Sequence, residues 1–182
     1  IHKEQDDFTP LMRAAIVGHS EVAATLLEHG ADAGEKVIKN DGYHPMLFAS
    51  LQGQRQIVAQ LLRLRPAAAH QADHNGLTPL MAASKNGHTA TVRLLLLAEG
   101  ARKAIDTVDA TETSALMWAI KGSHAAAAKV LMAAGANAKI NDVTGNNPIK
   151  EATKNDDDMC IKALGIQRGK KPGAWKRSQS FT

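Results

Sequence analysis

Five segments of the chain repeat one short pattern at a nearly constant spacing. The pattern is a polar residue, then a proline or alanine, then apolar residues, with an alanine close behind them. Its second position is occupied by Pro10, Pro45, Pro79, Ala115 and Pro148, so successive copies begin 35, 34, 36 and 33 residues apart. Such a period is typical of solenoids, in which each unit stacks on its neighbours to bury its apolar face.

The start of each copy predicts the first turn of a helix. Thr9, Thr78, Ser114 and Asn147 precede the second position, and residues of these types cap helix N-termini through a side-chain oxygen. Proline is well placed directly after them, because the first helical residue does not need its N–H.

A reversal and a second helix complete each copy. Glycine or serine followed by histidine, at residues 18–19, 87–88 and 123–124, ends the short first helix. An apolar run follows and ends at Gly-Ala, at residues 30–31, 100–101 and 135–136. The unit is therefore a turn, a short helix, a reversal and a longer helix.

This unit resembles the ankyrin repeat, most clearly over residues 73–88, DHNGLTPLMAASKNGH, and the resemblance covers roughly residues 6–164. It implies an all-α solenoid of about five helix-turn-helix repeats with β-turn fingers. We expect a domain over residues 1–164, with repeats near 6–38, 39–72, 73–105, 109–141 and 142–164. It also implies a module that binds a protein partner in a concave groove and is not an enzyme.

The chain departs from the family pattern in two places. The family's histidine after Pro-Leu is replaced, and soft apolar contacts are expected there instead, at Met12, Leu47, Met81, Met117 and, as a polar exception, Lys150. The last repeat is polar, as a terminal repeat facing water should be. The first repeat is not polar, since it carries Ile16 and Val17, which leaves open a further repeat or a partner on that side.

Candidate contact residues follow from the positions that face the groove in this family. The finger-tip row reads Phe8, Tyr43, Leu77, Thr113 and Asn146. A second row, just after the small pair of the first helix (Ala14-Ala15 and Ala82-Ala83), reads Ile16, Leu51, Ser84, Lys121 and Lys154. Packing of Phe8 and Tyr43 under neighbouring turns, and of Trp118 in the core, are the alternatives. The predicted partner-binding residues are Phe8, Arg13, Ile16, Tyr43, Leu51, Leu77, Lys85, Thr113, Trp118 and Lys121.

The sequence offers no pattern for catalysis, a cofactor or a metal. His70 and His74 have a metal-ligand spacing, but they fall in a predicted turn without a further ligand, so a solvated loop is the better interpretation. Asp156–Asp158 lack the glycine and terminal Glu of a calcium loop and are interpreted as charge at a helix N-terminus. Cys160 is expected to be an inert thiol.

The single cysteine excludes an internal disulfide and favours a reducing, intracellular and cytoplasmic setting. No apolar run approaches the length of about 18 residues that a membrane span needs.

The last 18 residues, 165–182, hold five basic residues and no acidic one, which leaves 17 basic against 18 acidic residues in 1–164. We expect an extended tail that contacts an acidic protein surface, with nucleic acid and a nuclear-import signal as alternatives. Its predicted contacts are Arg168, Lys170, Lys171, Trp175, Lys176 and Arg177. Ser180 follows Arg177 at a spacing that basic-directed kinases favour, which makes it a candidate phosphosite.

The sequence therefore predicts a protein-interaction module: a scaffold, adaptor or regulatory subunit. The alternative is a structural subunit of a large assembly, for example a ribonucleoprotein, held by the basic tail. Steep salt dependence of binding would favour that alternative.

Overall fold

The structure, a computed structural model, describes residues 8–33, 42–98, 100, 101 and 104–166. Its described part contains five helix pairs. The first helices of the pairs, here called the inner helices, are α1 (Pro10–Val17), α3 (Pro45–Leu51), α5 (Pro79–Lys85), α7 (Ala115–Lys121) and α9 (Pro148–Lys154). The second, or outer, helices are α2 (Ser20–Glu28), α4 (Arg55–Leu64), α6 (Thr89–Leu95), α8 (Ala125–Ala133) and α10 (Asp158–Ala163). A short 3₁₀ helix, η1 (Pro66–His70), follows α4.

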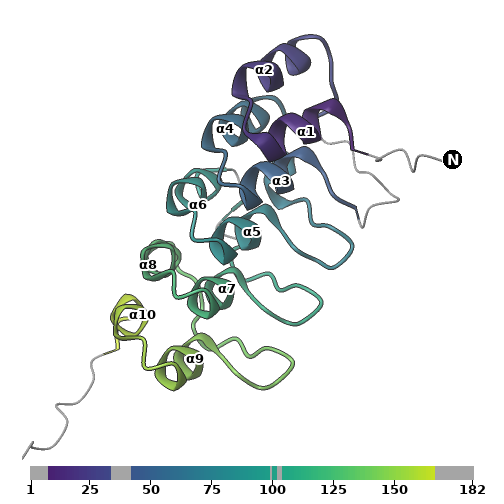
Figure 1. Cartoon of the computed structure of the whole chain (residues 1–182). Coiled ribbons are helices and arrows are strands. Elements are labelled where there is room, and N and C mark those ends of the chain that lie inside the picture. Colours follow the sequence, from purple (N-terminus) through teal and green to yellow (C-terminus); the bar gives the residue numbers. More distant parts are fainter. Residues whose placement is uncertain (1–7, 34–41, 99, 102–103, 167–182) are drawn as a thin grey trace, which may run out of the picture.

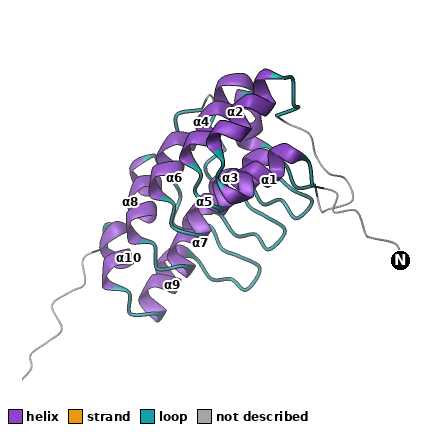
Figure 2. Cartoon of the chain, turned by 45° about the horizontal axis from the view of Figure 1, so that its top comes forward, coloured by secondary structure: helices purple, strands orange, loops and turns teal. Residues whose placement is uncertain are grey.

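The five pairs stack side by side in two rows. The inner helices form one row and the outer helices the other, and the connecting loops project as fingers beside the inner row (Figures 1 and 2). In the described part, β-structure is limited to isolated bridge residues, among them the pair Val108 and Ser114. The predicted all-α solenoid with turn-like fingers is confirmed, whereas the predicted basic tail lies outside the described residues apart from Gly165 and Ile166.

Helix starts agree with the caps that the sequence predicts. The side chains of Thr9, Thr78, Ser114 and Asn147 accept hydrogen bonds from the amide three residues on, at 3.2, 3.3, 3.3 and 3.0 Å. In the second pair the cap is His44, whose Nδ1 accepts from the Leu47 amide. Each cap satisfies a backbone donor that the first turn would otherwise leave unpaired.

The reversals between paired helices also join neighbouring pairs. The His88 ring lies where a Cβ on Gly53 would be, and its Nε2 donates to the Leu51 carbonyl at 3.0 Å. His124 repeats this contact one pair further along, on Gly87 and the Lys85 carbonyl, at 3.1 Å. Gly53 and Gly87 have φ of 70° and 72°, so glycine provides both the backbone conformation and the space.

Aspartates shape the fingers. The Oδ1 atom of Asp73, Asp109 and Asp142 in each case accepts from the amides two and four residues later. Adjacent fingers are joined by backbone hydrogen bonds, from Ala110 to Asn75 at 2.8 Å and from Val143 to Thr111 at 3.2 Å. The fingers are therefore held in position by the same loop geometry in three successive repeats.

The core between the rows is built from small and flexible side chains. The expected soft apolar contacts are confirmed at Met12, Leu47, Met81 and Met117, which are at most 2% exposed. Polar side chains in the last repeat, such as Lys150, Lys154 and Asp156, are exposed as expected. No helix in the described part is both long and apolar enough to cross a bilayer.

Candidate protein-interaction surface

Three aromatic rings gather at the amino-terminal end of the inner row. The Phe48 ring, on α3, lies 5.4 Å from the Phe8 ring and 5.2 Å from the Tyr43 ring, measured between centroids. All three residues are half-buried, so each ring packs against its neighbour while part of it remains open to solvent. We call Phe8, Tyr43 and Phe48 the aromatic cluster.

The predicted aliphatic contact residues come from the same two repeats as this cluster and from the third. Ile16 and Leu51 occupy equivalent positions near the ends of α1 and α3, and Leu77 lies in the third finger; all three are half-buried. Arg13 is exposed on α1, at the position that Phe48 occupies on α3. We call the surface formed by these inner-helix and finger residues the inner face.

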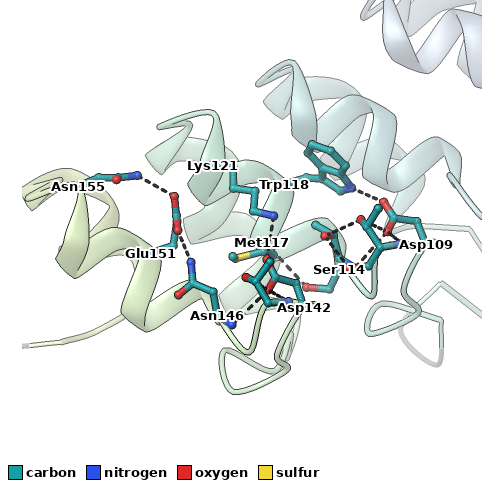
Figure 3. A network of polar contacts seen from close by, with 12 residues as sticks. Asp109, Ser114, Met117, Trp118, Lys121, Asp142, Asn146, Glu151 and Asn155 are labelled. Carbon is teal, nitrogen blue, oxygen red and sulfur yellow. Dashed lines mark hydrogen bonds and ion pairs between the residues drawn. The ribbon is translucent and has the colours of Figure 1, made fainter.

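Trp118 occupies the same position on α7 and is held on two sides. Its Nε1 donates to Asp109 Oδ2 at 2.8 Å (Figure 3), which fixes the half-buried indole against the fourth finger. Lys85 Nζ, from the neighbouring helix α5, lies 4.4 Å from the ring centroid, and Lys121 Nζ lies 5.7 Å from it. An ammonium at these distances is attracted by the ring's π electrons.

Two carboxylates organise this end of the face. Lys121 Nζ donates to Asp142 Oδ2 at 2.9 Å (Figure 3), linking α7 to the fifth finger. The hydrogen bond from the Thr144 hydroxyl and the contact with Lys121 hold the pKa of Asp142 far below its usual value, although burial opposes them. Burial also opposes ionisation of Asp109, but hydrogen bonds from the Thr111 hydroxyl, Thr113 and Trp118 outweigh it, and that pKa is lowered as well.

Two residues that the sequence placed on this surface are buried. Thr113 is fully buried, because its amide bonds to Asp109 and its hydroxyl to Thr111 within the finger, so it is dropped from the contact surface. Ser84 is also fully buried, with its hydroxyl bonded to the Leu80 carbonyl, so its place in the second row was wrong. The exposed residue at the end of that inner helix is Lys85.

The residues weighed for other chemistry have structural roles. The His74 ring packs where a Cβ on Gly42 would lie, while His70 is 3.6 Å from such an atom on Gly100, so each ring packs against a different glycine turn. Cys160 is fully buried on α10, where burial and Asp157 raise the pKa of its thiol to about 12, as expected for an inert cysteine. Asp157 caps α10 through the Cys160 amide at 3.0 Å, which confirms the interpretation of this acidic run.

The structure also reveals an apolar surface that the sequence analysis did not identify. Leu64, the last residue of α4, and Leu97, two residues beyond α6, are 62% and 82% exposed. Leu97, together with Leu62, Leu94 and Pro66, lines a shallow groove on the outer row. The sequence analysis did not single out these leucines, because a dense apolar run does not show which of its members face outward.

Comparison with known proteins agrees with the fold and the repeat contacts. A family model described as three copies of the ankyrin repeat matches residues 1–68 and 46–142. The chain belongs to the ankyrin-repeat family, whose repeats generally mediate protein–protein interaction. The fifth helix pair lies beyond the matched residues and continues the same stack.

Similar curated proteins are much longer than this chain. Inversin of Canis lupus familiaris is 29% identical over 87% of the chain and 14% of its own length. Ankyrin repeat protein nuc-2 of Neurospora crassa is 32% identical over 69% of the chain and 11% of its own length. E3 ubiquitin-protein ligase XBAT33 of Arabidopsis thaliana is 34% identical over 48% of the chain and 17% of its own length. The chain thus corresponds to a small part of each of them.

Proposed function

We propose that this chain is a protein-interaction module, acting as a scaffold, adaptor or regulatory subunit, that binds its partner through the inner face and the adjoining finger residues. One observation carries the proposal. The chain has only six aromatic residues, two Trp, one Tyr and three Phe, and four of them, Phe8, Tyr43, Phe48 and Trp118, lie on this face. The other two, Trp175 and Phe181, belong to the tail outside the described residues.

The four aromatic residues are all half-buried, although the core next to them is filled by alanine, leucine and methionine. Folding stability alone would favour complete burial of such large apolar side chains. Partly exposed aromatic residues are instead typical of the positions that contribute most to protein–protein binding. A partner that covers the inner face would bury the remaining aromatic surface.

The same surface gives no support to an enzymatic role for this stretch. Asp109 and Asp142 are each occupied by several hydrogen bonds that hold a finger and an inner helix together. Cys160 is fully buried and its pKa is raised, so the thiolate needed for nucleophilic chemistry is suppressed. We propose that this stretch contributes recognition, and that any reaction belongs to parts of a longer protein, as the name of the XBAT33 ligase illustrates for that relative.

Affinity purification with the full chain tests this proposal. Proteins retained by the wild type should be lost with the double variant Tyr43→Ala/Leu77→Ala, which removes side chains from the inner face. Leu97→Ala, which removes an 82% exposed leucine from the outer row, should retain them. Circular dichroism must first show that all variants remain folded. If the folded double variant retains every protein that the wild type does, the inner face is not the binding surface.

A further inference from the structure

Lys85 is a cation positioned on the inner face without a neutralising partner. Among the described residues no carboxylate lies within ion-pair distance of its Nζ, whose recorded contact is the ring of Trp118 at 4.4 Å. The indole itself is fixed by Asp109. The ammonium is therefore held in one place by an aromatic surface, which lowers the entropy lost when an anion binds to it.

Two further lysines extend this charge toward the last repeat. Lys121 and Lys154 occupy the positions on α7 and α9 that correspond to Lys85 on α5. Lys121 is partly neutralised by Asp142 at 2.9 Å, whereas Lys154 is exposed. The equivalent positions on α1 and α3 are Ile16 and Leu51, so the face changes from apolar to cationic along the stack.

The distance between the two ends limits what can bind to both. Phe48 and Trp118 occupy the same position of the inner helix, on α3 and α7, two repeats apart. Packed helices are about 8–10 Å apart, so the two side chains are separated by roughly 16–20 Å. An extended chain rises about 3.3 Å per residue and covers that span with about five or six residues.

We propose that the inner face binds an extended acidic segment of a partner protein. An apolar side chain of that segment packs on the aromatic cluster, and an Asp or Glu about five or six residues away accepts a hydrogen bond from Lys85 Nζ beside Trp118. This inference rests on the proposed function and specifies the partner's chemistry. The positive charge of Lys85 favours an acidic residue in the partner segment. The half-exposed rings of Phe8, Tyr43 and Phe48 favour an apolar one.

A carboxylate fits the cationic end better than a phosphate group does. A phosphate carries nearly two negative charges and is recognised best by several uncompensated cations or by the planar fork of arginine. Here Asp142 already binds Lys121, Asp109 lies at the indole edge, and Arg13 is on α1 at the opposite end of the stack. One uncompensated ammonium on Trp118 matches one carboxylate.

Selection from a random phage-displayed library of peptides, about twelve residues long to exceed the expected span, tests the inference with the full chain as bait. We expect selected peptides to contain an apolar residue and an Asp or Glu about five or six positions apart. For one such peptide, measured by fluorescence anisotropy, Lys85→Gln should weaken binding about tenfold. Replacing the Asp or Glu of the peptide by Asn or Gln should weaken binding to the same extent. The two changes together should weaken binding little more than either change alone.

Lys129→Gln is the matched control, because it removes the same charge from an exposed position on the outer helix α8. Equal losses for the Lys85 and Lys129 variants would overturn the inference, since they would indicate unspecific attraction. Selected peptides without acidic residues that still lose binding with Tyr43→Ala would also overturn it, while leaving the proposed function intact. Much tighter binding of a phosphoserine peptide would assign the site to phosphate instead. If no peptide is enriched on the inner face, this inference fails, whereas the proposed function is decided separately by the affinity purification.

Discussion

His44 connects the start of the second helix pair to the linker that leads into the third, because its Nε2 lies 2.9 Å from the backbone oxygen of Gln71. A carbonyl oxygen only accepts, so Nε2 carries the proton and donates it. The other ring nitrogen, Nδ1, accepts from the Leu47 amide at the start of α3. One fully buried side chain therefore caps a helix and fixes the turn after η1.

His44 should stabilise the stack through two contacts, the helix cap and the bond to Gln71, and two variants can separate their contributions. His44→Ala removes the cap and the bond to Gln71, and should lower the free energy of unfolding by about 2–3 kcal/mol. His44→Asn keeps a capping oxygen but cannot reach Gln71, so we expect about half of that loss. Urea unfolding followed by circular dichroism measures both. Equal destabilisation by the two variants would show that the cap contributes nothing.

Glu112 is strained where the other fingers use glycine. Its φ is 56°, and the equivalent residues Gly42, Gly76 and Gly145 have φ of 77°, 76° and 74°. Glu112→Gly should raise the free energy of unfolding by about 0.5–1 kcal/mol, because relief of the left-handed strain exceeds the entropy that glycine adds to the unfolded chain. Thermal unfolding provides the measurement.

Glu112→Ala is the control for this prediction, since it removes the charge and keeps the Cβ. It should give no comparable gain in stability. If both variants are stabilised equally, the effect comes from the lost carboxylate and the backbone explanation is wrong.

The sequence predicted the features that depend on neighbouring residues. Caps such as Thr9 and Ser114, and the glycine reversal at Gly87, act within one turn of helix, so residue type and spacing suffice. The stacking of five pairs followed from the period alone.

Features that depend on tertiary contacts between side chains and distant loop residues were missed. The role of His44 needs Gln71, which is 27 residues away, and the second oxygen of Asp109 meets Trp118 only once the finger folds onto α7. Placing Ser84 in the second row was a register error of one residue, although Lys85 was among the predicted contacts. One residue turns a helix by about 100°, which is enough to move a side chain from solvent into the core.

Acidification should loosen the fingers of the last two repeats. The folded-state pKa values of Asp109 and Asp142 lie below those of the unfolded chain. Their contribution to stability is therefore complete above the unfolded pKa of about 3.9, and is lost as the pH falls through that value toward the lower folded pKa. Below about pH 5 the unfolded state begins to bind more protons, so the free energy of unfolding should fall with falling pH.

Asp142→Asn removes one of these titrating groups, and it should reduce the slope of stability against pH between about pH 5 and pH 3. Glu28→Gln, which removes an exposed negative charge at the end of α2, is the charge-matched control and should keep the wild-type slope. Urea unfolding at a series of pH values gives the three slopes. An Asp142→Asn slope equal to that of the wild type would mean that the hydrogen bonds from Thr144 and Lys121 do not favour the ionised carboxylate, and that the fifth finger is held by other contacts.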